Sequence, residues 1–355
     1  MGINPSIHKT LKEENIFLKP SIESKPHVVI LGAGASKAAM PERDKFGQKI
    51  PLLDEIPALE ELAPEWELLI SNACPPPGNF ESIFSWLKQK TIYSSQLSKI
   101  ENIIESYFEK LHLPDYPTIY DYLVLGLRAK DTIATFNWDP LLMQAYIRNK
   151  DVVALPDIRF LHGCVNFATC NDHDVLGMPS ETCPICNTKL KRGKLFYPVE
   201  NKDYTEDNLI NRDWANVTEK LKEAFHLTIF GYSGPKTDSK ARKLILDNWN
   251  PTPIKDFKQF CHAEIIDKKT EDESDGNFIE RIEKRWIDYF PYSHRMIESN
   301  FWESSIAMWP RRTFEWKCSV SIKGKPLFKN IGPYKTDSLK ELQAWFSELS
   351  NAENK

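Results

Sequence analysis

The sequence predicts an α/β protein with a Rossmann-like, doubly wound parallel sheet, a helical lobe, a small cysteine-rich insert and a C-terminal α+β extension. Three observations lead to this fold class. Short apolar runs rich in β-branched residues alternate with helical patterns along most of the chain. The first of these runs, residues 28–31, leads into a Gly-Ala-Gly turn and a helix. Four of the expected strands run directly into glycine or polar residues, which collect at one edge of a parallel sheet.

Composition narrows the class of protein. The chain has 355 residues, 41% of them hydrophobic and 27% charged, which is typical of a water-soluble globular protein. A net charge of −4 gives no general attraction to nucleic acid. No apolar run reaches membrane-spanning length and the N-terminal residues lack a signal-peptide core, so we expect a cytoplasmic protein. An odd number of cysteines, seven, argues against a disulfide framework.

The chain divides into three parts. Residues 1–26 form a polar tail, residues 27–270 the main domain, and residues 271–355 the extension. Within the main domain, residues 40–56 read as a loop because proline and glycine interrupt any helix. Residues 57–128 have apolar side chains at helical spacing, with Pro75–Gly78 between two helices, and are expected to form a helical lobe.

Strand patterns return after this lobe. Residues 132–136, 157–161, 226–230 and 263–266 are predicted strands, the last of them the final strand of the sheet. Helices are predicted near 141–148, 214–225 and 238–249. In the extension we expect a helix over 278–289, a hairpin of residues 317–323 with 327–331, and a terminal helix over 338–349 capped by Ser338.

The turn Gly32-Ala33-Gly34, with the helix expected to begin at Ser36, forms a candidate phosphate cradle. Glycine allows a ligand to approach the backbone, and free N–H groups at a helix N-terminus attract anions. The same turn also closes many βα units without binding anything, so by itself it leaves both readings open.

Polar residues follow the other predicted strands. Asn137 comes after residues 132–136, His162 after 157–161, Ser233 after 226–230, and Asp267 after 263–266. In an open α/β sheet the ligand crevice lies outside the carboxyl ends of the strands. We therefore expect these side chains to share one site, although each alone also suits a turn, a cap or a packed histidine.

The insert, residues 164–194, carries a candidate zinc site. Cys170 and His173 form one pair and Cys183 and Cys186 a second pair, each with two residues between its ligands. Thiolates and an imidazole at this spacing suit a closed, tetrahedral, structural Zn²⁺ site. Two alternatives stay open: Cys164 replaces His173 as the fourth ligand, or the residues are free thiols beside a surface histidine.

The order of these motifs resembles the sirtuin superfamily over residues 27–270. The shared features are the glycine turn ending at Ser36, Asn137-Trp-Asp139, His162-Gly163, the zinc insert, Gly231-Tyr-Ser233 and the strand ending at Asp267. Protein-deacylating sirtuins carry Gln before the Asn, where this chain has Phe136, and a Phe-Gly-Glu stretch where it has residues 196–202. Gly231, Ser233 and Asp238 look more like bacterial sirtuin-like proteins that destroy NAD+ during phage defence.

The resemblance implies roles for these residues. Gly32, Ala33, Gly34 and Ser36 would hold the pyrophosphate of NAD+, and Gly231, Ser233 and Asp238 would contact its ribose or phosphates. Asn137 would place a water or the ribose hydroxyls, Asp139 would orient the nicotinamide carboxamide, and His162 would act as general base. Asp267 would accept from the adenosine ribose hydroxyls.

Three functions are compatible with these expectations. The leading hypothesis is an NAD+ glycohydrolase in antiviral defence, controlled by oligomerisation or a regulatory partner. The second is an NAD-dependent protein deacylase, favoured by the zinc insert. The third is a non-catalytic sensor that binds NAD+ or ADP-ribose.

Overall fold

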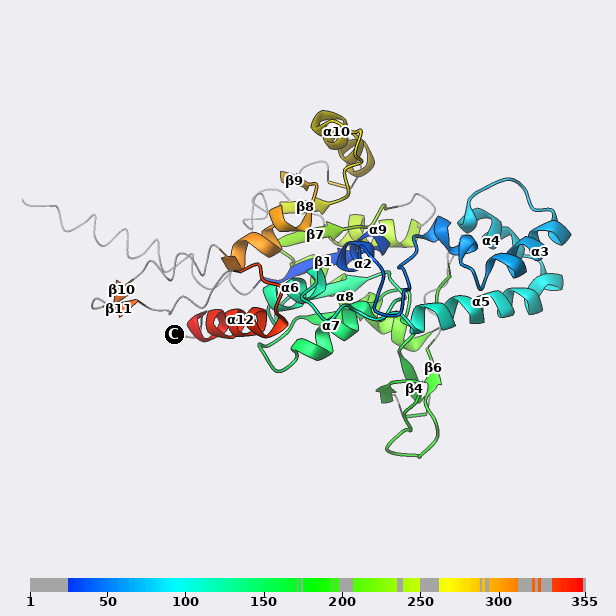
Figure 1. The fold of residues 1–355 in the computed structure, drawn as a ribbon, viewed down its shortest axis with the longest axis horizontal. Coiled ribbons are helices and arrows are strands. Elements are labelled where there is room, and N and C mark those ends of the chain that lie inside the picture. Colours follow the sequence, from blue (N-terminus) through cyan, green and yellow to red (C-terminus); the bar gives the residue numbers. More distant parts are fainter. Residues whose placement is uncertain are drawn as a thin grey trace, which may run out of the picture.

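A six-stranded parallel sheet forms the centre of the computed structural model (Figure 1). Its strands are β1 (His27–Leu31), β2 (Thr132–Thr135), β3 (Asp157–Phe160), β7 (His226–Phe230), β8 (His262–Ile266) and β9 (His294–Glu298). They lie in the order β3-β2-β1-β7-β8-β9, and every neighbouring pair is parallel. This order is that of a doubly wound Rossmann-like sheet, so the predicted fold class is confirmed.

The structure describes residues 25–170, 172–173, 175–193, 195–197, 207–234, 239–249, 262–287, 289–290, 294–311, 321–322, 325–326 and 334–353. Residues 1–24 of the tail expected over 1–26 lie outside these ranges, as does the strand expected over 327–331. Among the described residues, none of the helices combines the length and the apolar character that a bilayer-spanning segment needs.

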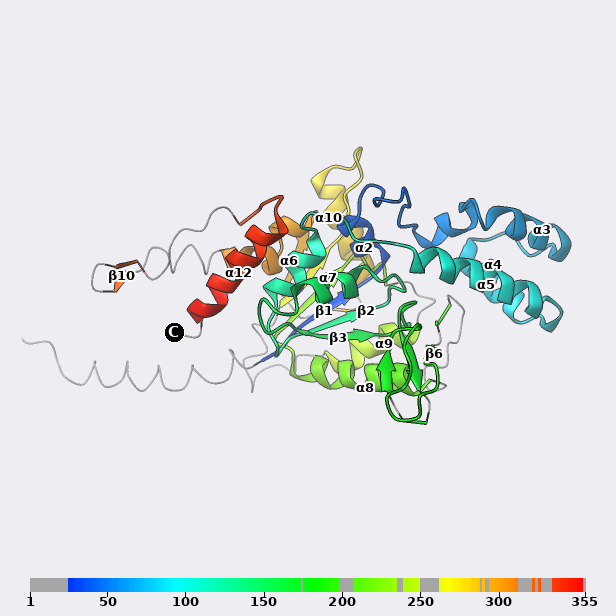
Figure 2. The same cartoon turned by 60° about the horizontal axis from the view of Figure 1, so that its bottom comes forward.

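Helices cover both faces of the sheet, as Figure 2 shows. Val29 and Leu31 share a core with residues of α2 (Ala33–Ala39), α6 (Ile119–Gly126), α7 (Leu141–Asn149) and α12 (Leu339–Glu353). Val28 and Ile30 share the opposite core with α8 (Asn208–Glu223), α9 (Ser239–Asn248) and α10 (Asp275–Trp286). Each of these four β1 side chains is fully buried, which stabilises the fold by roughly 1.5–3 kcal/mol apiece.

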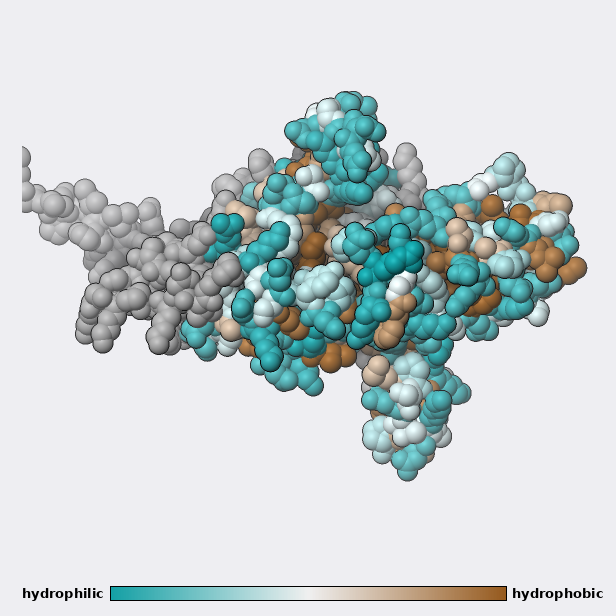
Figure 3. Space-filling view, in the orientation of Figure 1, coloured by the Kyte–Doolittle hydropathy of each residue, from teal (hydrophilic) through white to brown (hydrophobic). Residues whose placement is uncertain are grey.

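The expected helical region over residues 57–128 separates in space into two parts. Helices α3 (Ala63–Ala73), α4 (Phe80–Lys88) and α5 (Ser94–Glu109) project from the sheet as a lobe, whereas α6 packs on α7 (Figure 1). The 3₁₀ helix η1 (Leu53–Ala58) links the lobe to α2. Figure 3 shows hydrophobic residues on the lobe surface, where Leu68 and Ile92 are exposed.

The cysteine-rich insert is a three-stranded antiparallel sheet of β4 (Ala168–Cys170), β5 (Val175–Gly177) and β6 (Lys191–Arg192). It extends away from the main sheet beside α8 (Figure 1). Its small core contains Ala168, Cys183 and Leu190, so few apolar groups hold it together.

One strand prediction was wrong: residues 263–266 are not the final strand, because β9 pairs with β8 at the edge of the sheet. Residues 295–298 of β9 are half-buried, and its sequence His-Arg-Met-Ile-Glu lacks the continuous apolar run of a central strand. Further along the chain lie η4 (Phe301–Glu303), β10 (Ser321–Ile322), β11 (Lys325–Pro326) and α12, the helix expected at the C-terminus.

Candidate functional site

A cavity of about 590 Å³ lies at the carboxyl ends of β1 and β7, where the strand order reverses. In doubly wound sheets this switch point is the place where ligands bind. Its lining brings together the predicted site residues Gly32, Ala33, Gly34, Asn137, Asp139, His162, Gly231, Ser233 and Asp267. Residues 50–56 and part of the lobe close the other side of the cavity. The expectation that residues from separate strands share one site therefore agrees with the geometry.

The glycine turn of β1 packs directly on the turn that follows β7. A Cβ atom at Gly32 would lie 2.5 Å from the carbonyl oxygen of Gly231, and a Cβ at Gly34 would lie 2.9 Å from the Cα of Gly231. Gly231 itself has a φ of 62°. Glycine is thus required at these positions by a backbone-to-backbone contact.

This contact changes two sequence expectations. The helix begins at Ala33 rather than at Ser36, with Gly32 as its N-cap. The N–H groups of Gly32 and Gly34 donate to the carbonyls of Phe230 and Gly231, each at 3.0 Å. They are therefore not free to bind an anion, and the expected cradle is reduced to groups such as the exposed Ala33.

Asn137 follows β2 and is 9% exposed. Its side-chain Nδ2 donates to the carbonyl of Gly32 and to Ser36 Oγ, each at 2.8 Å. Its backbone N–H donates to Thr135 Oγ1 at 3.0 Å, which fixes the chain as it leaves the strand. The Asn137 side chain is thus held by the first turn of α2 while it lines the cavity.

Ser36 and Asp139 form a buried pair beneath this cavity. Ser36 Oγ donates to Asp139 Oδ2 at 2.6 Å, and Asp139 Oδ1 accepts from the N–H of Leu141 at 3.1 Å. Burial raises the pKa of Asp139 from 3.8 to about 6, and these hydrogen bonds only partly oppose the shift. Ser36 is fully buried, so in this structure it contacts side chains of the floor rather than the cavity space.

His162 is 8% exposed and lines the cavity together with Asn137. Its ring lies against Phe136, with centroids 4.8 Å apart, and its carbonyl accepts from the N–H of Phe196 at 3.0 Å. Phe136 also stacks on Tyr232, with centroids 4.5 Å apart. An aromatic wall therefore holds the imidazole at the carboxyl end of β3.

The opposite end of the cavity is charged. Asp267, directly after β8, accepts from Arg285 of α10 at 2.9 Å, and Arg281 of the same helix lies 3.5 Å from it. Both Asp267 and Arg285 line the cavity, beside Ser233. Asp238, the remaining residue expected at the site, lies outside the described residues.

Sequence reasoning missed three residues at this site. Tyr120 of α6 touches the floor, whereas Phe196 and Arg285 line the cavity. Tyr120 falls within the region predicted to be helical, and nothing in its spacing links it to Asn137. Arg285 lies on the polar face of an amphipathic helix, where charged residues are the rule.

The four predicted metal ligands come together in the insert. The ligand atoms of Cys170, His173, Cys183 and Cys186 all lie within 4.8 Å of one another. Cys170 Sγ is 3.4 Å from His173 Nδ1 and 3.6 Å from Cys186 Sγ, and Cys183 Sγ is 3.7 Å from His173 Nδ1. A tetrahedral zinc ion, with Zn–S near 2.3 Å and Zn–N near 2.0 Å, holds its ligands roughly 3.5–3.8 Å apart.

The chemistry of the donors also fits zinc. Hydrogen bonds from Thr188 lower the pKa of Cys186 to about 6, which favours its thiolate form. Asn187 adopts a φ of 55° and donates its N–H to the carbonyl of Cys183 at 2.8 Å, which closes the knuckle. Cys164 is not part of the cluster: it is buried, and its Sγ lies 3.7 Å from the carbonyl oxygen of Asp139. Among the described residues, His173 rather than Cys164 is therefore the fourth member of the cluster.

No family model and no curated protein matches this chain. Among solved structures, it is similar to a mutant Sir2 homologue in complex with ADP-ribose, with 14% identity over 86% of this chain and 99% of that chain and a TM-score of 0.43. It is also similar to Sir2 in complex with an inhibitor, 2′-O-acetyl-ADP-ribose and a deacetylated peptide, with 13% identity over 86% and 98% of the two chains and a TM-score of 0.38. A Sir2 homologue in complex with NAD matches with 14% identity over 84% and 93% and a TM-score of 0.35. Identities and TM-scores at this level assign neither an activity nor a ligand to this chain.

Proposed function

We propose that this protein is an NAD+ glycohydrolase, which converts NAD+ and water to nicotinamide, ADP-ribose and a proton. The observation that carries the proposal is that Asn137 and His162 line one cavity at the switch point of the sheet, over the glycine turn of β1. The motif order that resembles the sirtuin superfamily supports it, because that resemblance implies cleavage of the bond between nicotinamide and ribose.

The residues divide this chemistry between them. Nicotinamide is a good leaving group, so the site must mainly orient the ribose and stabilise the positive charge that develops on it. The Oδ1 atom of Asn137 accepts from a ribose hydroxyl or from the attacking water. The imidazole of His162 takes the proton of that water as the oxygen bonds to C1′, because an imidazole is the side chain best suited to act as a general base near neutral pH.

The rest of the dinucleotide extends from this point. Its phosphates would lie beside the Gly32–Gly34 turn, where Ala33 is exposed and lines the cavity. Ser233 and Asp267 lie farther along the cavity lining, and the adenosine ribose reaches them. Asp139 lines the cavity and accepts from Ser36, so it remains placed to orient the nicotinamide carboxamide as expected.

Deacylation of an acyl-lysine peptide is the second candidate. The metal cluster favours it, since deacylating sirtuins carry the insert that this chain resembles. Two departures favour hydrolysis instead: Phe136 stands where those enzymes have Gln, and Phe196 packs beside His162 where they have the Phe-Gly-Glu stretch. A sensor that binds NAD+ or ADP-ribose without turnover is the third outcome.

Nicotinamide release from NAD+ by the purified full chain, with and without an acylated peptide, separates the three. We expect release without peptide, and we expect Asn137→Ala and His162→Ala to lower it about a hundredfold or more. His112→Ala is the control, because this histidine lies in the linker after α5, with its Nδ1 2.7 Å from the carbonyl of Lys110. Release only with peptide would establish the deacylase, and binding without release the sensor.

We further infer that the activity is restrained, because unrestrained hydrolysis of NAD+ in the cytoplasm would deplete the host. Oligomerisation or a regulatory partner would supply the restraint, and an antiviral role would follow from the resemblance to phage-defence proteins. The molar mass of the protein in solution tests the oligomerisation. Phage plaque counts on cells that express wild type or Asn137→Ala test the antiviral role. A monomer that is fully active alone, or equal plaque counts, would contradict them.

A further inference from the structure

Tyr120, a residue of α6, reaches the floor of the cavity from outside the sheet. It is fully buried, and its hydroxyl lies 2.7 Å from Ser36 Oγ and 3.4 Å from Asn137 Nδ2. Burial and the nearby Asp139 raise the pKa of Tyr120 well above 10, so the hydroxyl keeps its proton. No motif in the sequence singled this residue out.

Counting donors and acceptors fixes the direction of each hydrogen bond. A serine hydroxyl has one proton and two lone pairs. Ser36 gives its proton to the Asp139 carboxylate, so it must accept from its other two partners, Asn137 Nδ2 and the Tyr120 hydroxyl. The chain of donors therefore runs from Tyr120 to Ser36 to Asp139.

The same count orients the amide of Asn137. Its two Nδ2 protons are used by the carbonyl of Gly32 and by Ser36 Oγ. The side chain consequently turns its Oδ1 away from the floor, and the site presents an acceptor to a ligand hydroxyl. If Ser36 turned its proton toward Asn137 instead, the amide would lose one of the two acceptors that hold it in this orientation.

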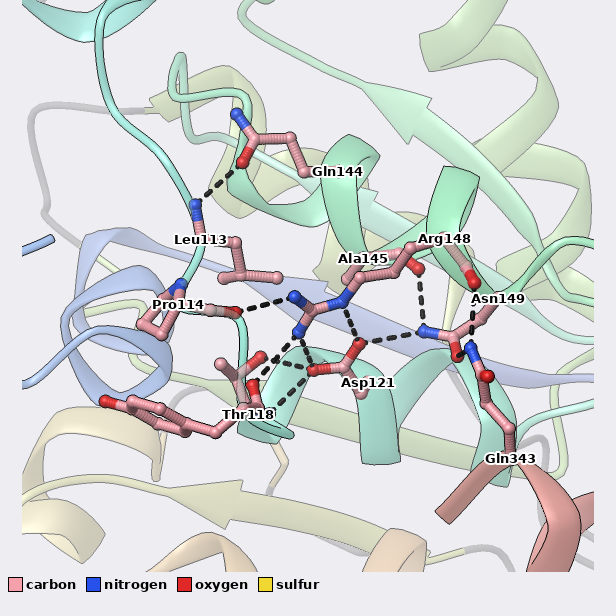
Figure 4. A network of polar contacts seen from close by, with 10 residues as sticks. Leu113, Pro114, Thr118, Asp121, Gln144, Ala145, Arg148, Asn149 and Gln343 are labelled. Carbon is pink, nitrogen blue, oxygen red and sulfur yellow. Dashed lines mark hydrogen bonds and ion pairs between the residues drawn. The ribbon is translucent and has the colours of Figure 1, made fainter. Parts of the chain in front are cut away.

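A second network fixes Tyr120 in place through the next residue of α6 (Figure 4). Asp121 is fully buried and accepts from Arg148 Nε at 2.6 Å, from Arg148 Nη2, and from Asn149 Nδ2 at 2.8 Å. The N–H and hydroxyl of Thr118 also donate to it, at 2.6 Å and 2.8 Å. Helix α6 is thereby clamped to α7 one residue away from Tyr120.

We propose that Tyr120 is a positioning residue, which holds Ser36 as a donor to Asp139 and thereby keeps the Asn137 amide oxygen facing the substrate. The proposal rests on the proposed function for its kinetic readout, but the buried network itself is open to measurement without turnover. The Tyr120 hydroxyl contacts Ser36 and Asn137, and within the described part of the chain Tyr120 is not among the residues that line the cavity.

The test compares Tyr120→Phe with Tyr122→Phe in the full chain. Tyr122 lies on the same helix, but its hydroxyl donates to the carbonyl of Tyr334 and accepts from the N–H of Thr336, away from the site. We expect Tyr120→Phe to lower kcat for nicotinamide release about tenfold with a change in KM below about twofold. Tyr122→Phe should leave both near the wild-type values.

A pH readout separates positioning from a general loss of packing. Without the Tyr120 hydroxyl, Ser36 is a weaker donor to the Asp139 carboxylate, so the acid limb of kcat should move to higher pH. Asp139 is faced by Ser36, Tyr120 and the thiol of Cys164, whose pKa burial raises to about 12. Of these groups, only the Tyr120 hydroxyl is removed in Tyr120→Phe, so a shift of the acid limb of kcat in that variant is attributed to its loss.

The carboxyl pKa of Asp139, followed by NMR of ¹³C-labelled aspartate and assigned with Asp139→Asn, gives the same answer without substrate. An upward shift in Tyr120→Phe and none in Tyr122→Phe supports the proposal, even if wild type releases no nicotinamide and the proposed function fails. An unchanged Asp139 pKa, or an equal loss of kcat in both variants, overturns it.

Discussion

The side-chain amide of Asn137 donates to the carbonyl oxygen of Gly32 at 2.8 Å, across 105 residues of chain. This bond joins the carboxyl ends of β2 and β1, and it orients the candidate catalytic amide by a backbone group of the glycine turn. Any change that moves this turn should therefore disturb both the fold and the chemistry of the site.

Gly231→Ala should be much more damaging than Gly47→Ala. Both glycines have positive φ, 62° and 84°, but a Cβ at Gly231 would lie 2.2 Å from the nitrogen of Ala35, whereas a Cβ at Gly47 meets nothing within 4 Å. We expect Gly47→Ala to cost about 1 kcal/mol and Gly231→Ala roughly 3 kcal/mol or more. Urea unfolding measures both, and equal losses would contradict the close contact between the two turns.

Asp139→Asn should stabilise the fold while it impairs activity. Because the folded pKa of Asp139, about 6, exceeds the ordinary value of 3.8, the native state loses stability as pH rises through 6 and the buried carboxyl ionises. Removing the charge should raise the free energy of unfolding at pH 7.5 by roughly 1–3 kcal/mol, with a smaller gain at pH 5. Turnover should fall, since the amide imitates the protonated acid and reverses the donor direction of Ser36.

The control for this variant is Asp115→Asn, a change at an exposed carboxylate 3.8 Å from Lys45. Asp115→Asn should measurably alter neither the free energy of unfolding nor the turnover. Urea unfolding at the two pH values, together with nicotinamide release, provides the measurements. Loss of stability in Asp139→Asn at both pH values would refute the interpretation.

The sequence predicted the strands and their ends well, because fully buried parallel strands are continuous apolar runs. The direction of the chain in each parallel strand then shows which edge of the sheet holds the carboxyl ends, where ligands bind. Asn137, His162 and Asp267 could be placed in one site on that basis. The edge strand β9 could not be predicted, since its sequence His-Arg-Met-Ile-Glu lacks that pattern. The role of Tyr120 could not be predicted either, because it depends on how α6 packs. Packing between distant segments leaves no periodic pattern in the sequence.

His27→Gln should weaken the pH dependence of stability at the opposite end of β1. Burial, reinforced by His226 and Lys130, lowers the pKa of His27 well below 6.5. Thr228 donates to Glu264 at 2.9 Å, so the His27 Nε2 group, 2.8 Å from Thr228, is the donor to it, and the neutral ring satisfies this bond. Its contribution is complete above pH 6.5 and is lost as the pH falls toward the folded pKa.

For wild type, this predicts that the free energy of unfolding falls by up to about 1.4 kcal/mol per pH unit below 6.5 on account of His27. Glutamine keeps an N–H donor but does not titrate, so His27→Gln should show a shallower slope between pH 6.5 and 5. His112→Gln, in the linker after α5, serves as the comparison. A slope in His27→Gln as steep as in wild type would rule out this histidine as the source.

Loss of zinc should unfold the insert and leave the main sheet intact. The insert has a core of only a few residues around the buried Cys183, so coordination must supply most of its stability. We expect about one zinc per chain in wild type and in Cys164→Ser, and little in Cys183→Ser or His173→Ala. Metal analysis of the purified variants gives these values, and proteolysis within residues 164–194 reports the unfolding. Zinc retained in His173→Ala but lost in Cys164→Ser would reverse the ligand assignment, because only a ligand's removal should release the ion.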